Sequence, residues 1–256
     1  MKVTFLGTGT SSGVPMIGCA CAVCTSLDFR DQRLRVSVHV EVAGRSLVID
    51  TGPDFRQQAL RHRIGHLDAL LFTHEHKDHT AGLDDIRAYN YRQQQDMPLF
   101  GEGRVLRQLR QEFAYIFADH KYPGVPRVSL HEIESDTAPF DVLGVAVQPL
   151  RALHHRLPVL GFRIGGFCYL TDANFIGPET LDLMRDADVV VLNALRREAH
   201  LSHFTLAEAV AILEDLQPKR AFLTHISHQL GRHGEVEKEL PAFIRLAYDG
   251  LVVAVT

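Results

Sequence analysis

The sequence has little that would place the protein in a membrane or on a polyanion. Its first residues, "MKVTFLGTGTSSG", lack a basic segment followed by a long apolar stretch. No apolar run approaches the roughly 20 residues that a membrane span needs. The formal charge of -4 at pH 7 gives no electrostatic reason to expect a nucleic-acid or anionic-membrane surface. We therefore expect a cytoplasmic protein with no membrane partner and no stable nucleic-acid partner.

Cysteine is also scarce, and its placement argues against a disulfide framework. Three of the four cysteines, Cys19, Cys21 and Cys24, lie together in "GCACAVC", too close to one another for useful disulfides. Reduced thiolates bound to a metal are the better interpretation. The fourth, Cys168, stands alone in an apolar stretch, and we expect it in the core.

No Ser/Gly linker or block of charge divides the 256 residues. The apolar content of 46% and charged content of 23% are ordinary for a soluble globular protein. The chain is long enough to bury a substantial core, and we expect a single domain over residues 1–256.

The alternation of short apolar runs with segments of helical period predicts a layered α/β fold. The turns "AGRS" and "IGGF" favour hairpins, and so antiparallel pairs within the sheets. We expect strands at 2–7, 36–42, 45–50, 68–73, 97–101, 127–131, 143–149, 160–165, 167–171, 188–192, 220–224 and 251–255. We expect helices at 54–62, 82–92, 103–117, 178–185, 205–215 and 235–246.

The two halves of the chain echo each other. "LVIDTGPDF" resembles "CYLTDANF", and "LLFTHEH" resembles "AFLTHISH". One interpretation is a duplicated strand and helix unit whose strand ends meet at one shared site. Chance similarity between short segments is the alternative, and the sequence leaves both open.

Histidine is abundant, at 15 residues, and four ligand-type side chains fall within "THEHKDH" directly after an apolar run. His74 and His76 are two apart, so in extended backbone both point to the same side. Asp78 and His79 follow where the chain turns helical and point elsewhere. One pair can therefore hold one ion and the other pair a second. Imidazole and carboxylate ligands suit zinc, manganese or iron, and a carboxylate can bridge two ions.

"THEHKDH" resembles the H-x-H-x-D-H signature of the metallo-β-lactamase fold hydrolases. The resemblance implies a four-layer αββα sandwich and a two-metal site. It implies His74, His76 and one histidine of the 154/155 pair on the first metal, for which we choose His154. The second metal would take Asp78, His79 and His225, with Asp172 bridging. Asp50, in "VIDTG", resembles the family's strand-end aspartate that supports the site from behind.

The cysteines narrow the resemblance further. A closed tetrahedral zinc site needs one ligand besides Cys19, Cys21 and Cys24, and His228, three residues beyond His225, is well placed. "GTGTSSGVPMIGCACAVC", "THEHKDHTAGLDD" and "LTHISHQ" together resemble the cyclic phosphodiesterase branch of the superfamily, whose typical enzyme carries an accessory Cys3His zinc. We expect one structural zinc here and two divalent ions, zinc or manganese or iron, in the active site. Segments 82–95 and 103–125 are where we expect substrate selectivity.

The resemblance implies a hydrolase of small cyclic phosphodiesters, with a hydroxide held between the two metals and Asp78 and Asp172 in the catalytic site. A histidine of near-neutral pKa suits protonation of the leaving oxygen. "HFTLAEAV" resembles the family segment that carries such a histidine, so we assign His203 as general acid, with His200 as a weaker candidate and a structural role beside a helix as the alternative. tRNA 3′-end processing, thioester or lactam hydrolysis and a non-catalytic metal module are the rival functions. The sequence allows a homodimer without requiring one.

Overall fold

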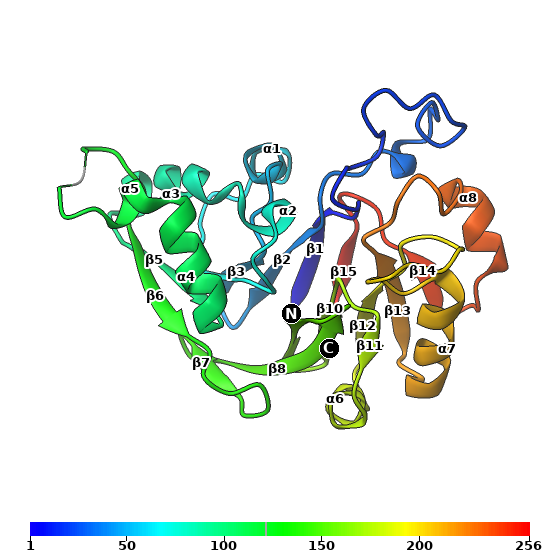
Figure 1. The fold of residues 1–256 in the computed structure, drawn as a ribbon. Helices are drawn as coiled ribbons and strands as arrows, with labels where there is room; N and C mark the ends of the chain where they lie inside the picture. The colour runs from blue at the N-terminus through cyan, green and yellow to red at the C-terminus, as the bar shows by residue number, and fades with distance from the viewer. Residues whose placement is uncertain (121) are drawn as a thin grey trace.

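Two β-sheets face each other in this computed structural model, which describes residues 1–120 and 122–256, and helices cover the outer face of each sheet (Figure 1). The first sheet has the strand order β15-β1-β2-β3-β4-β5-β6. Its strands are β1 (Lys2–Gly7), β2 (Ser37–Val42), β3 (Arg45–Ile49), β4 (Ala69–Leu71), β5 (Met97–Gly101), β6 (Val128–Glu132) and β15 (Val252–Ala254).

The second sheet has the order β11-β8-β9-β10-β12-β13-β14, with β7 paired to β8. Its strands are β7 (Phe140–Val142), β8 (Val145–His154), β9 (Leu157–Ile164), β10 (Phe167–Leu170), β11 (Phe175–Ile176), β12 (Val189–Asn193), β13 (Arg220–Thr224) and β14 (Ile244–Leu246). The helices are α1 (Phe55–Arg61), α2 (Lys77–Thr80), α3 (Arg87–Gln93), α4 (Gly103–Glu112), α5 (Ala114–Phe117), α6 (Pro178–Met184), α7 (Leu206–Leu216) and α8 (His233–Val236).

Alternation along the strands produces the layers. In β1, Val3 and Phe5 point into the core between the sheets, whereas Leu6 packs under the helices on the outer face. A third apolar cluster lies between the second sheet and helices such as α7, which buries Ala209 and Leu213. Because every sheet face carries its own apolar set, the chain forms the predicted four-layer αββα sandwich.

The hairpins form at the predicted turns, and most strands lie within two residues of the expected bounds. β8 and β9 are longer than predicted because Pro149 and Pro158, which read as strand breakers, lie inside the paired register. The strands β7 and β11, of 3 and 2 residues, are too short to give a periodic signal.

The predicted helix at 235–246 is wrong. Only α8 and a 3-10 turn at Glu237–Glu239 are helical there, since Pro241 cannot continue a helix. Beyond it, Ile244 and Leu246 are buried and pair with β13 as a parallel edge strand. Two further helices are interrupted: segment 82–92 begins as a 3-10 turn at Leu83–Ile86, and segment 103–117 breaks at Phe113.

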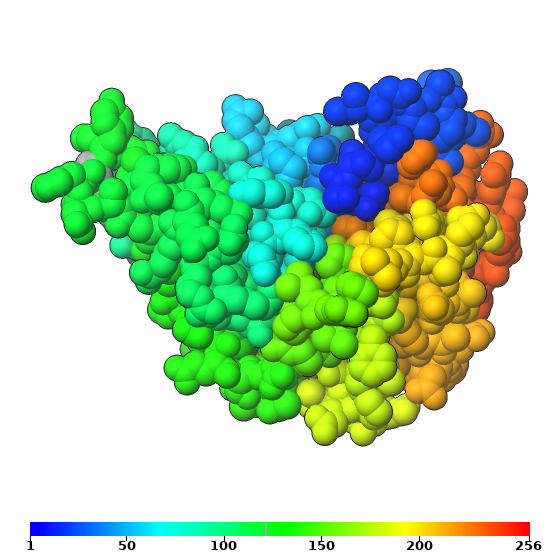
Figure 2. Space-filling model, viewed as in Figure 1, coloured from blue at the N-terminus to red at the C-terminus, as the bar shows by residue number. Residues whose placement is uncertain are grey.

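In the part of the chain that the structure describes, we find no helix long and apolar enough to cross a membrane. The loop between β1 and β2 lies over the segment that follows β13, as the contact of the blue and orange surfaces shows (Figure 2). Arg232 donates to the carbonyl of Ala22 across this contact. The N-terminal loop is thereby held beside the carboxyl end of β13.

Candidate metal centre

The segment after β4 presents its ligand-type residues on two kinds of backbone, as predicted. β4 ends at Leu71, and His76 is the extended N-cap residue of α2. His74 and His76 therefore project from extended chain, while Asp78 and His79 lie in the first turn of α2. This short change of conformation divides the four side chains into two pairs.

The first pair meets His154, the last residue of β8, and the ligand atoms of these three histidines all lie within 4.8 Å of one another. Nε2 of His74 and Nδ1 of His76 are 3.0 Å apart. His154 directs Nδ1 to the carbonyl of Ser202, at 2.9 Å. His155 is exposed in the turn that follows, with φ 58°, so the structure brings His154 rather than His155 into this group.

Asp78 and His79 meet Asp172 and His225 in a second group, whose ligand atoms also lie within 4.8 Å of one another. Oδ2 of Asp172 lies 3.4 Å from Nε2 of His79 and 4.0 Å from Nε2 of His74. Oδ1 of Asp172 lies 2.9 Å from Nδ1 of His225. The Asp172 carboxylate therefore stands between the two groups, where a bridging ligand is needed.

The buried nitrogens of the second group fit a cation. Nε2 of His79 and Nδ1 of His225 are buried and make no hydrogen bond, although buried polar atoms are almost always paired. Burial lowers the pKa of His79, but the carboxylates of Asp172 and Asp78 outweigh it and hold that pKa well above its usual range. The carboxylates thus favour positive charge at the place where these unpaired nitrogens converge. Imidazole and carboxylate donors of this kind suit zinc, manganese or iron.

Asp50 lies behind the ligands, as predicted, and accepts three hydrogen bonds. The donors are the Thr73 backbone N–H at 2.9 Å, the Thr73 hydroxyl at 2.8 Å and Nδ1 of His79 at 2.7 Å. Thr73 Oγ1 in turn lies 3.0 Å from Nδ1 of His74. Asp50 therefore orients His79 directly and His74 through Thr73, and leaves Nε2 of each ring directed at the site.

His203 lies at the edge of both groups. A ligand atom of His203 is within 4.8 Å of those of His154 and Asp172, and its ring stacks on His225 at 4.7 Å. The side chain is 8% exposed and its Nδ1 has no partner. Burial and the neighbouring His225 lower the pKa of His203 to about 3.

His203 does not cap the helix that follows it. The N-cap of α7 is Thr205, which forms a capping box with Glu208. His200, the weaker candidate, is partly exposed and its ring lies 5.0 Å from that of His203. The structure therefore places His203, and not His200, beside Asp172.

The three N-terminal cysteines meet His228 in a separate group, with ligand atoms within 4.8 Å of one another. Nδ1 of His228 lies 3.4 Å from the sulfurs of both Cys19 and Cys21. The Cys24 backbone N–H and the His228 imidazole lower the pKa of Cys21 to about 6, and burial raises that of Cys24 to about 11. Three thiols and one imidazole match a closed structural zinc site.

Cys168 is buried in the core, as predicted.

The strand ends of the two echoing halves do meet at this site, and three of them are strained. Asp50, Asp172 and His225 follow β3, β10 and β13 with φ of 63°, 55° and 55°, a region that costs free energy for residues other than glycine. Asp50 and Asp172 each end the third strand of an antiparallel meander. His74 and His225 do not correspond in this way, because β4 adjoins β3 whereas β12 separates β13 from β10.

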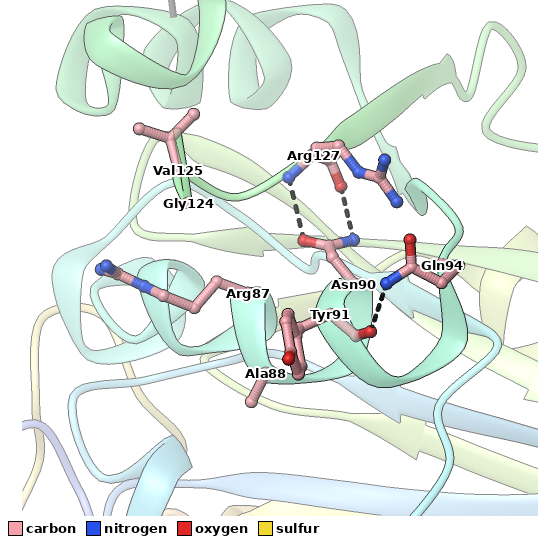
Figure 3. Close-up of a pocket in the computed structure, with 8 residues that line it drawn as sticks. All are labelled: Arg87, Ala88, Asn90, Tyr91, Gln94, Gly124, Val125 and Arg127. Carbon is pink, nitrogen blue, oxygen red and sulfur yellow. Dashed lines mark hydrogen bonds between the residues drawn. The ribbon is translucent and has the colours of Figure 1, made fainter. Parts of the chain in front are cut away.

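A surface pocket of about 470 Å³ lies away from these groups, between α3 and the segment before β6. Figure 3 shows Asn90 holding that segment through paired hydrogen bonds to the backbone of Arg127. Arg87, Tyr91 and Val125 also line the pocket. It falls in the two segments where we expect selectivity, but no metal-group residue lines it.

Comparison with known proteins identifies relatives over the whole chain. Residues 45–226 match the family model of the β-lactamase superfamily domain. The crystal structure of a new diphosphatase from the PhnP family has a TM-score of 0.92 and 40% identity, and the match covers 100% of this chain and 98% of that one. Zinc-bound PqqB from Methylobacterium extorquens, with a TM-score of 0.79, 19% identity and 100% of both chains covered, shares the fold.

One curated relative is longer than this chain. The octanoyltransferase of Porphyromonas gingivalis is 41% identical over 253 residues, which are 98% of this chain and 51% of that protein. The chain therefore spans about half the length of this relative.

Proposed function

The chain belongs to the metallo-β-lactamase superfamily, and from that premise we propose that it is a metal-dependent phosphodiesterase acting on small cyclic phosphodiesters. The observation that carries the proposal is the position of Asp172 between the group of His74, His76 and His154 and the group of Asp78, His79 and His225. Two divalent cations in these groups would supply a nucleophile at neutral pH and polarise the phosphoryl oxygens.

The chain's own residues set the geometry of the reaction. Asp172 links the two groups, since its Oδ2 lies near both His74 of the first group and His79 of the second. Asp50 accepts from Nδ1 of His79 and so directs Nε2 of that ring at the candidate cation. These contacts form before substrate binds, so little reorganisation is needed during the reaction.

His203 is the proposed general acid for the departing oxygen. Its low pKa in the free protein, about 3, means that the imidazole is neutral at pH 7. A phosphodiester bound beside it brings negative charge, which favours the imidazolium. As general acid, His203 would take up its proton together with the substrate.

A small substrate agrees with the rest of the chain better than a tRNA. The net charge of -4 does not favour a long polyanion, whose affinity comes largely from contacts to phosphates. The PhnP-family relative is a diphosphatase. A diphosphate presents the same centre, a phosphorus atom with an oxygen leaving group, so it is the substrate class most similar to a cyclic phosphodiester.

Acyl transfer is the second candidate, and one observation favours it. The Porphyromonas gingivalis relative is an octanoyltransferase. If this chain acted on thioesters, an octanoyl thioester would be the substrate to test. That relative is about twice the length of the matched segment, and its name does not say which half carries the activity. The ligand groups and His203 favour phosphoryl chemistry for the half represented here.

A substrate panel tests the proposal. Purified protein loaded with zinc or manganese is incubated with a ribose cyclic phosphate, a diphosphate diester, a pre-tRNA and an octanoyl thioester. We expect turnover of the cyclic phosphate, and Asp172→Ala should abolish it. Preferred cleavage of the pre-tRNA or of the thioester by the wild type, with the cyclic phosphate untouched, would overturn the assignment.

A further inference from the structure

The histidines of the two metal groups share a pattern of hydrogen bonds. In three of them Nδ1 is held from outside the site: His79 by Asp50, His154 by the Ser202 carbonyl, and His74 by the Thr73 hydroxyl. Each contact fixes the ring orientation and leaves Nε2 for a cation. Of these three contacts, that of Asp50 is the one predicted from the sequence.

His225 follows the same pattern, but the roles of its two ring nitrogens are reversed: Nδ1 faces the site and Nε2 is held from outside. Its Nδ1 lies 2.9 Å from Oδ1 of Asp172 and makes no hydrogen bond, as two ligands of one ion would. Its Nε2 lies 3.2 Å from the hydroxyl of Thr10. If Nδ1 is to hold a cation, the proton must be on Nε2, and Thr10 Oγ1 is positioned to accept it.

Thr10 is itself fixed from both directions. Its backbone N–H donates to the carbonyl of Ile226 at 3.1 Å, and its carbonyl accepts from Gly13 at 2.8 Å. The N–H of Ile226 donates to Thr8 at 2.9 Å. Thr10 is 7% exposed. Its hydroxyl is thus tied by two short backbone bridges to the residue that follows His225.

The remaining contacts of His225 do not distinguish the two orientations of the ring that a 180° turn about the Cβ–Cγ bond exchanges. His203 and His79 stack on it with centroids at 4.7 and 6.0 Å, and stacking is the same in both orientations. His225 also has a left-handed backbone, with φ 55°, so its backbone is held by its surroundings rather than by local preference. The Thr10 hydroxyl supplies the directional contact.

We propose that Thr10 is a positioning residue that orients His225 and so sets the affinity of the Asp78, His79 and His225 group for its cation. The inference rests on the two-ion site of the proposed function. It concerns a residue 215 positions away from its histidine in the sequence, in the N-terminal loop that also carries the three cysteines.

The test compares metal binding by Thr10→Val, which keeps the shape and removes the hydroxyl, with Thr10→Ser, which keeps the hydroxyl. Metal-free protein is titrated with Co²⁺ alone, because cobalt bound to thiolates absorbs differently from cobalt bound to nitrogen and oxygen, which separates the Cys3His group. Thr10→Val should weaken the second active-site ion by about 10- to 100-fold, the usual effect of losing such a contact. Thr10→Ser should restore wild-type affinity.

A matched control is Thr8→Val, two residues earlier in the same loop. Thr8 is also buried, but its hydroxyl bonds to Asp249 and Arg33 and to no histidine of the metal groups. This variant should lose thermal stability and keep its cobalt affinity. If Thr10→Val fails to fold, Thr10→Ser and Thr10→Ala form a second pair that differs only in the hydroxyl.

A kinetic measurement separates positioning from catalysis. At saturating metal, Thr10→Val should recover most of its kcat, while the metal concentration for half-maximal activity rises. Wild-type cobalt affinity in Thr10→Val, equal weakness in Thr10→Ser, or equal weakness in Thr8→Val would each overturn the inference. Failure of the wild type itself to bind active-site cobalt would instead contradict the proposed two-ion site.

Discussion

Replacing Asp50 by Asn removes one negative charge from behind the metal groups and leaves the shape of the side chain unchanged. Asp50 accepts from the Thr73 N–H through Oδ1, and from the Thr73 hydroxyl and Nδ1 of His79 through Oδ2. An amide has one carbonyl oxygen. If that oxygen faces the Thr73 N–H, the NH₂ faces His79, and if it faces His79, the NH₂ opposes the Thr73 N–H.

In either orientation at least one buried donor is left without an acceptor. Such a loss costs about 1–3 kcal/mol of the free energy of unfolding. In the first orientation His79 must also move its proton from Nδ1 to Nε2, which then points at Asp172 and competes with a cation. Outer contacts of this kind change metal affinity by about 10- to 100-fold, or about 1.4–2.7 kcal/mol.

We therefore expect Asp50→Asn to fold, but with a lower free energy of unfolding, measured by urea unfolding. It should also bind active-site metal more weakly, measured by competition with a chelator. Asp68→Asn is the control. Asp68 accepts from the Ser46 N–H at 2.8 Å in the same sheet and belongs to neither metal group. This variant should have a lower free energy of unfolding and an unchanged metal affinity. Wild-type metal affinity in Asp50→Asn would refute the orienting role.

Three further predictions follow from other parts of the structure. Cys21→Ser should release one tightly bound zinc and lower the melting temperature, because structural zinc contributes to folding free energy; unchanged zinc stoichiometry would contradict the Cys3His site. His203→Ala should lose about 10²-fold or more in kcat on a ribose cyclic phosphate, within the range for general acids, and much less on bis(p-nitrophenyl) phosphate, whose leaving group needs no proton. An equal loss on both substrates would favour a binding role. Burial and the Arg33 guanidinium lower the pKa of His233 to about 4, so the unfolded chain binds the extra proton between about pH 4 and 6.5, and stability should rise with pH across that window by up to about 3 kcal/mol. Urea unfolding at both ends of the window should show a smaller rise of the unfolding free energy with pH for His233→Gln than for the wild type. An equal rise in the two proteins would contradict this prediction.

The side chains of the two candidate metal groups could be predicted because their signal is local. His74, His76, Asp78 and His79 fall within six positions, and the change from strand to helix that separates them is visible in the apolar pattern. Asp172 and His225 end apolar strands in the same way, and the family resemblance gave their order. Where the pattern was ambiguous, as between His154 and His155, the strand register decided the outcome, since the strand ends at His154.

Of the contacts that orient those side chains, that of Asp50 could be predicted and the others could not. The Ser202 carbonyl is a backbone group and carries no sequence signal, and Thr10 is one of several threonines in a glycine-rich loop. The sequence predicts a helix where the structure has the strand Ile244–Leu246, because three residues are too few to show a period of two. Its assignment depends on pairing with β13, which is a tertiary contact.

The most direct test of the two-ion account is a metal titration of activity. Protein stripped of its active-site metal is given increasing zinc or manganese, and hydrolysis of a ribose cyclic phosphate is followed together with metal bound per chain. We predict no turnover in the stripped protein, activity that rises as the group of Asp78, His79, Asp172 and His225 fills, and none at any metal concentration for Asp172→Ala. Full turnover by the stripped protein, or by Asp172→Ala, would contradict the account.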